Sequence, residues 1–99
     1  MTKVINIKSK HQYDVYCGRK NSYYKLEESI FHNPFVIGKD GTREEVIHKF
    51  KNYFYKRIND DEDFNYKLWR LKDKTLACWC IPLSCHCNVI ADFLDGKFS

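Results

Sequence analysis

The sequence lacks a long apolar run, because none of its hydrophobic stretches approaches the roughly 18 residues needed to cross a membrane. Residues 1–13 also lack the apolar region and the small-residue cleavage site of a secretory signal. These absences argue against a membrane protein and against a secreted protein with a cleaved leader. We therefore expect a cytoplasmic protein without a membrane partner.

The number of cysteines is odd, and no two of them form a Cys-x-x-Cys pair. The five cysteines are at positions 17, 78, 80, 85 and 87. In a reducing compartment an odd number is more typical of free thiols or metal ligands than of a disulfide framework. We therefore expect no disulfide clasp.

Flexible apolar side chains are scarce, with one methionine against seven phenylalanines, seven tyrosines and two tryptophans. Such large, rigid side chains suit a pocket wall as well as a core. The length of 99 residues predicts a single domain over 1–99. The formal net charge of +4 favours phosphate-bearing partners, whether a nucleic acid or a small nucleotide.

Strand patterns lie in the first and last thirds of the chain. β-Branched and aromatic runs at 3–7 and 13–17 predict two strands. Residues 18–41 keep neither the helical nor the strand period, so we expect a long structured loop there. A continuous apolar run at 74–80 predicts a strand buried on both faces, which is usually an internal parallel one.

Helix signals fill the rest of the sequence. Residues 42–45, Thr-Arg-Glu-Glu, match a capping box, and apolar residues then recur at three-to-four-residue spacing until about Asn59. The acidic run 60–63 is well suited to the start of a second helix, where carboxylates favour the positive end of the dipole. A further helix should follow residues 84–87 and stop at Gly96.

The resulting order of strand, strand, loop, helix, helix, strand and helix is an α/β pattern. We expect a small, mainly parallel, three-stranded or slightly larger sheet covered by helices, in a Rossmann-like arrangement. In such sheets ligands bind beyond the carboxyl ends of the strands. The segments at 16–19 and 78–86 therefore should meet at one edge of the sheet.

A resemblance to a known family rests on four segments: VIN at 4–6, YDVYCGR at 13–19, NPFVIGKDGTREEVI at 33–47 and LACWCIPLSCH at 76–86. Over residues 4–94 the chain resembles the small phage and bacterial family known as domain of unknown function 4326. The family name implies no activity. The resemblance implies the positions around which the fold is built, namely Gly18, Arg19, Asn33, Pro34, Phe35, Gly38, Arg43, Cys78, Cys80, Pro82, Cys85 and His86.

Departures from the family pattern bear on the chemistry. Cys87 and Asn88 stand where the family has Gly-Asp after Cys-His, which puts in doubt any chemistry that needs a carboxylate there. His32 stands where the family has a glycine before Asn-Pro-Phe, and the loop at 20–31 is longer than usual.

The cysteine-rich segment raises the question of a metal. Zinc ligand atoms are available in Cys80, Cys85, His86 and Cys87. Consecutive residues that open a helix project about 100° apart, so the last three cannot all face one ion. We therefore expect no bound metal and no cofactor, with Cys80, Cys85 and either His32 or His86 as the least strained ligand set.

A nucleophilic cysteine is an alternative interpretation. Cys85 sits where a helix N-terminus would lower the pKa of its thiol. His86 is expected to point elsewhere, so a base would have to come from His32 or His11. Cys78, in the middle of a strand, is expected to be an ordinary core thiol.

The turn at 81–86 is interpreted as an anion site at a helix N-terminus, with Ser84 as the predicted N-cap. Arg19, after Gly18, would add a guanidinium that binds phosphate bidentately. The open alternative is that Ser84 and Cys85 only cap their helix. The predicted ligand-binding residues are Gly18, Arg19, His32, Asn33, Phe35, Arg43, Trp79, Cys80, Ser84, Cys85 and His86.

The expected function is non-catalytic binding of a nucleotide-like phosphate ligand. The resemblance to a phage and bacterial family and the small size suggest a phage protein with an anti-defence role. Such a protein would sequester a host signalling nucleotide in the host cytoplasm. The alternatives are a compact enzyme that uses Cys85 or a histidine on a nucleotide or modified base, and a nucleic-acid-binding protein. Nucleic acid is the weaker of these, because no known DNA or RNA motif is present. A homodimer is compatible with the sequence.

Overall fold

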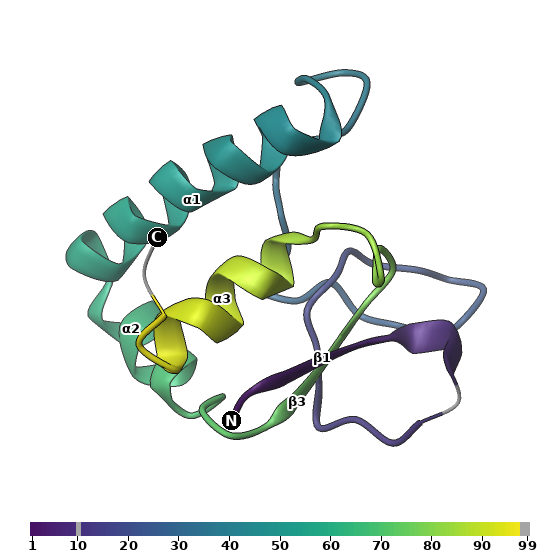
Figure 1. The fold of residues 1–99 in the computed structure, drawn as a ribbon, viewed down its shortest axis with the longest axis horizontal. Helices are drawn as coiled ribbons and strands as arrows, with labels where there is room; N and C mark the ends of the chain where they lie inside the picture. Colours follow the sequence, from purple (N-terminus) through teal and green to yellow (C-terminus); the bar gives the residue numbers. More distant parts are fainter. Residues whose placement is uncertain (10, 98–99) are drawn as a thin grey trace.

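A parallel sheet with helices packed beside it makes up the computed structural model, which describes residues 1–9 and 11–97 (Figure 1). The sheet has three strands in the order β1-β3-β2. Along the chain the elements are β1 (Lys3–Asn6), the 3-10 turn η1 (Ile7–Ser9), β2 (Val15–Tyr16), α1 (Arg43–Asp60), α2 (Glu62–Trp69), β3 (Thr75–Cys78) and α3 (His86–Leu94). The predicted α/β class, element order and parallel sheet are therefore confirmed, and the arrangement is loosely Rossmann-like.

β3 is the central strand, because Leu76 is paired with Val4 of β1 on one side and with Val15 of β2 on the other. The side chains of Leu76, Ala77 and Cys78 are all buried. This is the environment predicted for a continuous apolar run in an internal parallel strand. α3 packs against β1 and β3, and α1 packs against α2 and α3.

β3 ends at Cys78 and not at Cys80, so the predicted strand was too long. The backbone N–H groups of Cys80 and Ile81 donate hydrogen bonds to Cys78 Sγ. Asn6 Nδ2 also donates to the carbonyl oxygens of Trp79 and Ile81, at 3.1 and 2.8 Å. These bonds replace ladder pairing, so the chain leaves the sheet at Trp79 and turns towards α3.

β2 is an edge strand and is shorter than the predicted strand at 13–17. Asp14 N and Cys17 N still donate to carbonyl oxygens of β3, at 2.8 and 3.0 Å. The chain therefore runs beside β3 over 14–17, although regular strand geometry covers only Val15–Tyr16.

The helix starts are set by the predicted side chains. Thr42 Oγ1 accepts from Glu45 N at 3.2 Å, and Glu45 Oε1 accepts from Thr42 N at 3.0 Å, which completes the capping box of α1. Asp61 Oδ1 accepts from Phe64 N at 3.0 Å and caps α2. The acidic run therefore starts a helix, as the sequence indicated.

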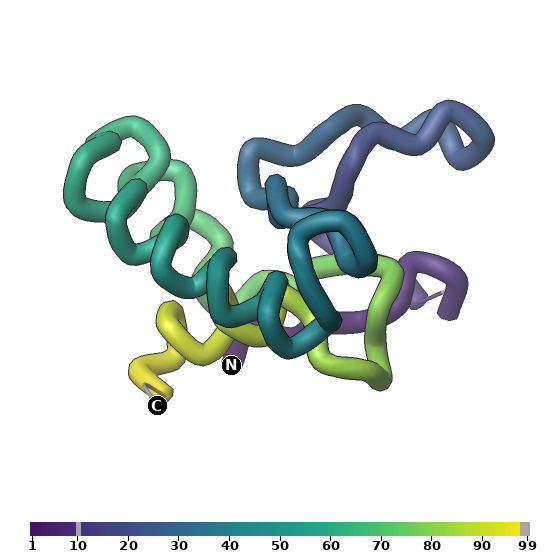
Figure 2. The backbone as a smooth tube through the Cα atoms, turned by 90° about the horizontal axis from the view of Figure 1, so that it is seen from above, coloured from purple at the N-terminus to yellow at the C-terminus, as the bar shows by residue number. Residues whose placement is uncertain are grey.

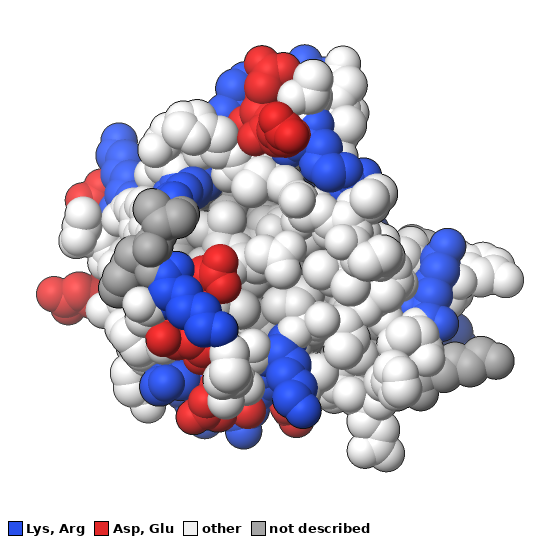
Figure 3. Space-filling view, in the orientation of Figure 1, with Lys and Arg blue, Asp and Glu red and all other residues white. Residues whose placement is uncertain are grey.

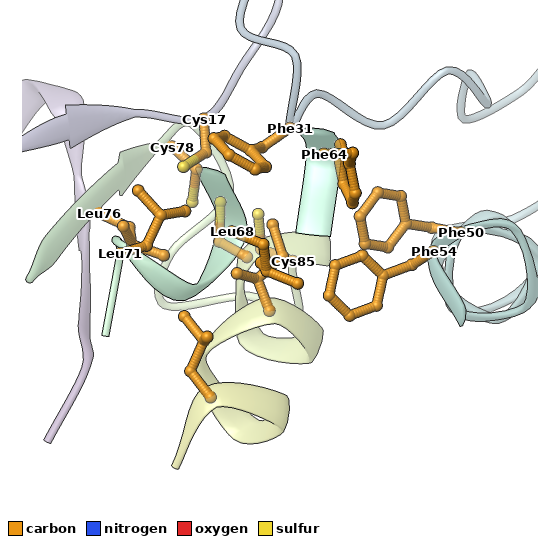
Figure 4. Close-up of a cluster of buried hydrophobic side chains, with 13 residues drawn as sticks. Cys17, Phe31, Phe50, Phe54, Phe64, Leu68, Leu71, Leu76, Cys78 and Cys85 are labelled. Atoms are coloured by element: carbon orange, nitrogen blue, oxygen red, sulfur yellow. The ribbon is translucent and has the colours of Figure 1, made fainter. Parts of the chain in front are cut away.

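The core is built on aromatic side chains from α1 and α2 that meet the inner face of α3 (Figure 4). Phe54 is fully buried, and its ring centroid lies 5.6 Å from that of Phe50, 6.1 Å from that of Phe64 and 5.5 Å from that of Phe93. These are the offset and edge-to-face distances that aromatic pairs prefer. The predicted apolar stripe of α1 therefore faces the core.

The segment at 18–41 is a long loop with short bridges at Asn21–Leu26 and Ile37–Gly41. Figure 2 shows it as the blue arch that leaves β2 and returns to the start of α1. Within residues 1–9 and 11–97, no helix is long and apolar enough to span a membrane.

Candidate functional site

A cavity of about 300 Å³ lies where β3 ends and where α1 and α3 begin. Ligands bind at the carboxyl ends of strands in α/β sheets, so its position is the one expected for this fold class. Ten of the eleven residues predicted to bind a ligand line it: Gly18, Arg19, Asn33, Phe35, Arg43, Trp79, Cys80, Ser84, Cys85 and His86. The structure therefore brings residues from both unusual segments and from the loop into one site.

His32 is the predicted residue that the structure does not bring into the cavity. Its Nδ1 hydrogen-bonds with Ser29 O at 2.7 Å, and its Nε2 lies 3.9 Å from Glu28 Oε1. The ring is therefore held against its own loop. Neither the proposed role as a base for Cys85 nor that as a metal ligand fits this position.

The sequence analysis did not predict most of the apolar residues that form the cavity wall. Val36, Ile37, Val46 and Ile47 line it, together with Cys78. Val46 and Ile47 belong to the apolar stripe of α1, which the helical period assigned to the core. The available signal was their place in the first turn of that helix, directly after the loop that carries the other site residues.

Arg19 is exposed, but two of its nitrogens are already used by the protein. Nε and Nη2 donate to Asn33 O at 3.2 and 2.7 Å, and Nη2 also donates to Phe35 O at 2.9 Å. Among the described residues, Nη1 has no protein partner. The guanidinium therefore holds the loop at Asn33 and Phe35 in place, and Nη1 stays available to a ligand.

Arg43 stands at the first turn of α1 and reaches across the cavity to the start of α3. Its Nη1 donates to Ser84 O at 3.2 Å, and its side chain is half-buried. One hydrogen bond leaves most of the five guanidinium N–H groups unused within the described part of the chain. Arg43 and Arg19 therefore bring two positive charges to the same cavity.

Asn33 and Phe35 shape the wall opposite α3. Asn33 Oδ1 accepts from Phe35 N at 2.9 Å, which forms a local turn in the Asn-Pro-Phe segment. Asn33 Nδ2 donates to Val46 O at 3.3 Å, and the ring of Phe35 lies 6.2 Å from that of Tyr53. The loop is therefore fixed to α1 on the side that faces the cavity.

Gly18 packs so closely against Tyr16 that a side chain does not fit there. A Cβ at Gly18 would lie 2.3 Å from Tyr16 Oη and 2.6 Å from Tyr16 Cζ. That hydroxyl donates to Arg19 O and accepts from Trp79 Nε1, both at 2.6 Å. Tyr16 therefore links both halves of the site and orients the indole of Trp79, a role that the sequence did not indicate.

The turn before α3 differs from the predicted N-terminal anion site. The N-cap is Cys85, with φ −139° and ψ 152°, whereas Ser84 is exposed and was wrongly assigned this role. Asn88 Oδ1 accepts from Cys85 N at 2.9 Å, and Cys87 N donates to Cys85 Sγ. Two donors of the first turn are therefore satisfied inside the protein, which leaves fewer backbone N–H groups for an anion.

Three buried sulfur atoms meet beneath the cavity. Those of Cys78, Cys85 and Cys87 all lie within 4.8 Å of one another. The expectation that Cys85 and Cys87 must diverge is wrong, because Cys85 has extended backbone angles and is not part of the helical turn. The geometric reason for expecting no metal therefore no longer holds.

The pKa values of these thiols are coupled. Hydrogen bonds from Cys85 and Cys87 lower the pKa of Cys78, so Cys78 is the sulfur that holds a negative charge most readily. The hydrogen bond to Cys78 raises the pKa of Cys85, which was expected to be lowered by the helix. Cys85 is also buried, so it lacks both features of a reactive thiol.

His86 is a buried residue that ties α3 to the end of β2. Its Nε2 hydrogen-bonds with Cys17 O at 2.7 Å, and its Nδ1 lies 3.5 Å from Cys85 Sγ. Burial lowers the pKa of His86, so the ring is neutral near pH 7. The prediction that His86 points away from Cys85 is wrong.

Comparisons with known proteins give a family but no activity. A protein of Enterobacteria phage T4, described as "Uncharacterized 12.4 kDa protein in nrdA-td intergenic region", is 38% identical over 63 residues, which is 63% of this chain and 58% of the phage protein. No solved structure matches the chain. The model of the family described as Domain of unknown function (DUF4326) matches residues 3–96, and the chain belongs to that family.

Proposed function

We propose that the protein binds a small nucleotide-like ligand in this cavity, chiefly through the ligand's phosphate, and does not convert it. The observation that carries the proposal is the pairing of two arginines with a largely apolar cavity. Arg19 and Arg43 line it, and among the described residues no aspartate or glutamate does. Such a site attracts an anion, and guanidinium groups match phosphate geometry.

The size and walls of the cavity suit a single nucleotide. Its volume of about 300 Å³ is at the lower end of the range found for small-molecule sites. The apolar side chains of Ile37, Val46 and Ile47 can accept a base or sugar while the arginines bind the charged end. The half-buried ring of Trp79 adds an aromatic surface on which a base can stack.

The thiol chemistry favours binding over catalysis. A nucleophilic Cys85 would need an accessible thiolate, but its thiol is buried and its pKa is raised by the hydrogen bond to Cys78. His86, the nearest base, is already engaged with Cys17 O. Among the described residues that line the cavity there is no aspartate or glutamate and no exposed histidine, so the half-buried thiol of Cys80 is the most accessible group for such chemistry.

The charge distribution favours a small ligand over a nucleic acid. On the face that Figure 3 shows, Lys and Arg side chains are mixed with Asp and Glu at the top and at the lower left, and they form no continuous basic stripe. A phosphate backbone needs such a stripe for its many contacts. The relative in phage T4 supports the association with phages. The role proposed for such a protein is to sequester a host signalling nucleotide in the host cytoplasm.

Replacement of Arg43 by alanine tests the proposal. Loss of a hydrogen bond to a charged group costs about 1.5–3 kcal/mol, so Arg43→Ala is expected to weaken binding by about tenfold or more. The measurement is calorimetric titration with the four common nucleoside monophosphates and, in parallel, with the matching nucleosides. At least one monophosphate should bind wild type, and it should bind more tightly than its nucleoside.

The matched control is Arg70→Ala, which removes an exposed arginine whose guanidinium lies 5.9 Å from the ring of Tyr66. This variant should bind as wild type does. Arg19→Lys is more informative than Arg19→Ala, because Arg19 also holds Asn33 and Phe35. Equal affinity of wild type for nucleotide and nucleoside, or equal loss in Arg43→Ala and Arg70→Ala, would contradict phosphate recognition at this site.

A further inference from the structure

The strongest unassigned feature is the group of three thiols beneath the cavity, contributed by Cys78 at the end of β3 and by Cys85 and Cys87 at the start of α3. All three side chains are at most 2% exposed. Small buried cysteines are common in cores, but they are seldom gathered so that three sulfurs face one point. The parallel register and the N-cap geometry produce this convergence from residues seven and nine positions apart.

The spacing of these sulfurs approaches that of a tetrahedral zinc site. Zinc-to-sulfur bonds of about 2.3 Å place two sulfur ligands about 3.8 Å apart. The three sulfurs of Cys78, Cys85 and Cys87 lie within 4.8 Å of one another. Shifts of about 1 Å or less therefore suffice to bring all three onto one ion.

The nearest candidate for a fourth ligand is His86, whose exposed fraction is 9%. Of these four groups, only the three sulfurs all lie within 4.8 Å of one another, so the His86 ring must move further than the thiols to reach the same ion. His86 Nδ1 lies 3.5 Å from Cys85 Sγ, whereas nitrogen and sulfur ligands of one tetrahedral zinc are about 3.6 Å apart. When Nε2 donates its proton to Cys17 O at 2.7 Å, Nδ1 carries the free lone pair. Metal-binding histidines are usually oriented by such a bond to a carbonyl oxygen.

The surrounding backbone is arranged to support a sulfur that carries negative charge. The N–H groups of Cys80 and Ile81 donate to Cys78 Sγ, and the N–H group of Cys87 donates to Cys85 Sγ. Three thiolates buried together repel one another unless a cation balances them. A divalent ion provides that balance.

We propose that Cys78, Cys85 and Cys87 bind one zinc ion, and that His86 turns towards the three sulfurs to become the fourth ligand. Thiolate and imidazole ligands in tetrahedral geometry favour zinc over calcium, magnesium or manganese. The ion would join the end of β3 to the start of α3 and so fix the floor of the cavity. This proposal is independent of phosphate binding, since a zinc site could be present in a protein that binds no nucleotide.

The first test is the metal content of the full chain, expressed with added zinc and purified under reducing conditions without chelator. Elemental analysis and native mass spectrometry are expected to find one zinc per chain. Cys78→Ser, Cys85→Ser and Cys87→Ser should each lower zinc affinity by more than about 100-fold, since loss of an outer-shell partner already costs 10–100-fold. The matched control is Cys80→Ser, which alters a half-buried thiol of the same turn and should keep its zinc.

A second test uses wild-type protein from which a chelator has removed the metal, and titrates it with Co²⁺. It gives a result even if a serine variant fails to fold. The expected spectrum has a thiolate-to-cobalt charge-transfer band and the intense visible bands of tetrahedral Co²⁺. His86→Asn should weaken those bands, whereas Cys80→Ser should retain them. Wild-type protein without zinc and with only the weak bands of octahedral Co²⁺ would overturn the site. Bands that stay unchanged in His86→Asn would overturn the assignment of His86.

Discussion

Phe54→Ala is expected to lower the free energy of unfolding by about 3–5 kcal/mol, the usual cost of truncating a fully buried phenylalanine. Phe54 is 0% exposed, and its ring meets aromatic rings from α1, α2 and α3. A domain of this size is stabilised by only about 5–15 kcal/mol in total. The variant should therefore be close to the limit at which the fold survives.

Urea denaturation followed by far-UV circular dichroism measures this effect. Tyr66→Ala is the matched control, because it truncates an aromatic side chain on α2 that is 66% exposed. Tyr66→Ala should lower the free energy of unfolding by no more than about 0.5 kcal/mol. The contact that it removes on the surface is the weak one between the Tyr66 ring and Arg70. Similar unfolding midpoints for the two variants would show that the α1, α2 and α3 interface is not the core of the domain.

Gly18→Ala is expected to damage the fold and the site together. The new Cβ would overlap the phenol of Tyr16, with 2.3 Å to its oxygen. Moving that ring breaks its hydrogen bonds with Arg19 O and with Trp79 Nε1. Two lost hydrogen bonds cost about 1–3 kcal/mol, and the indole of Trp79 loses the partner that orients it.

The measurements are urea denaturation, the fluorescence of Trp79 in a Trp69→Phe background, and calorimetry with the nucleoside monophosphates. Tyr16→Phe separates the two effects, because it removes the hydroxyl but adds no atom at Gly18. It should change the Trp79 signal and cost about 1 kcal/mol, while Gly18→Ala costs more. If Gly18→Ala leaves stability and fluorescence as in wild type, Tyr16 does not organise the site.

The parts of the fold that could be predicted depend on neighbours in sequence. The capping box of Thr42 and Glu45 involves residues three positions apart, so its pattern alone predicts where α1 begins. The buried central strand at Thr75–Cys78 is likewise visible as an apolar run. Such local signals were enough for the element order and the parallel sheet.

The missed features depend on residues that meet only after folding. β2 runs parallel to β3 with Tyr16 opposite Ala77, and this register brings Tyr16 to Trp79. No spacing in the sequence reports a parallel register. The N-cap at Cys85 in place of Ser84 is another case, since the choice follows from Asn88 reaching back to Cys85 N.

The candidate site shows the same division. The predicted residues at 18–19 and 79–86 were found because they follow strands, whereas Asn33, Phe35 and Arg43 are among the positions that the family resemblance implies. Ten of the eleven predicted residues do lie around one cavity. Their individual roles were harder to predict. Arg19 also ties down a loop, and His86 is bonded to a carbonyl oxygen of another element. Hydrogen bonds of this kind are visible only in three dimensions.

The central claim is that the cavity binds a phosphate-bearing ligand and leaves it unchanged, and recovery of that ligand tests it most directly. The full chain is incubated overnight with a mixture of cellular nucleotides, separated from free ligand and examined by native mass spectrometry, which also reports whether a homodimer forms. Ligand released by heat is then identified by mass. The prediction is one nucleotide per chain, chemically identical to the compound supplied and strongly reduced in Arg43→Ala. A cleaved or transferred product, or protein that retains no nucleotide, would contradict the account.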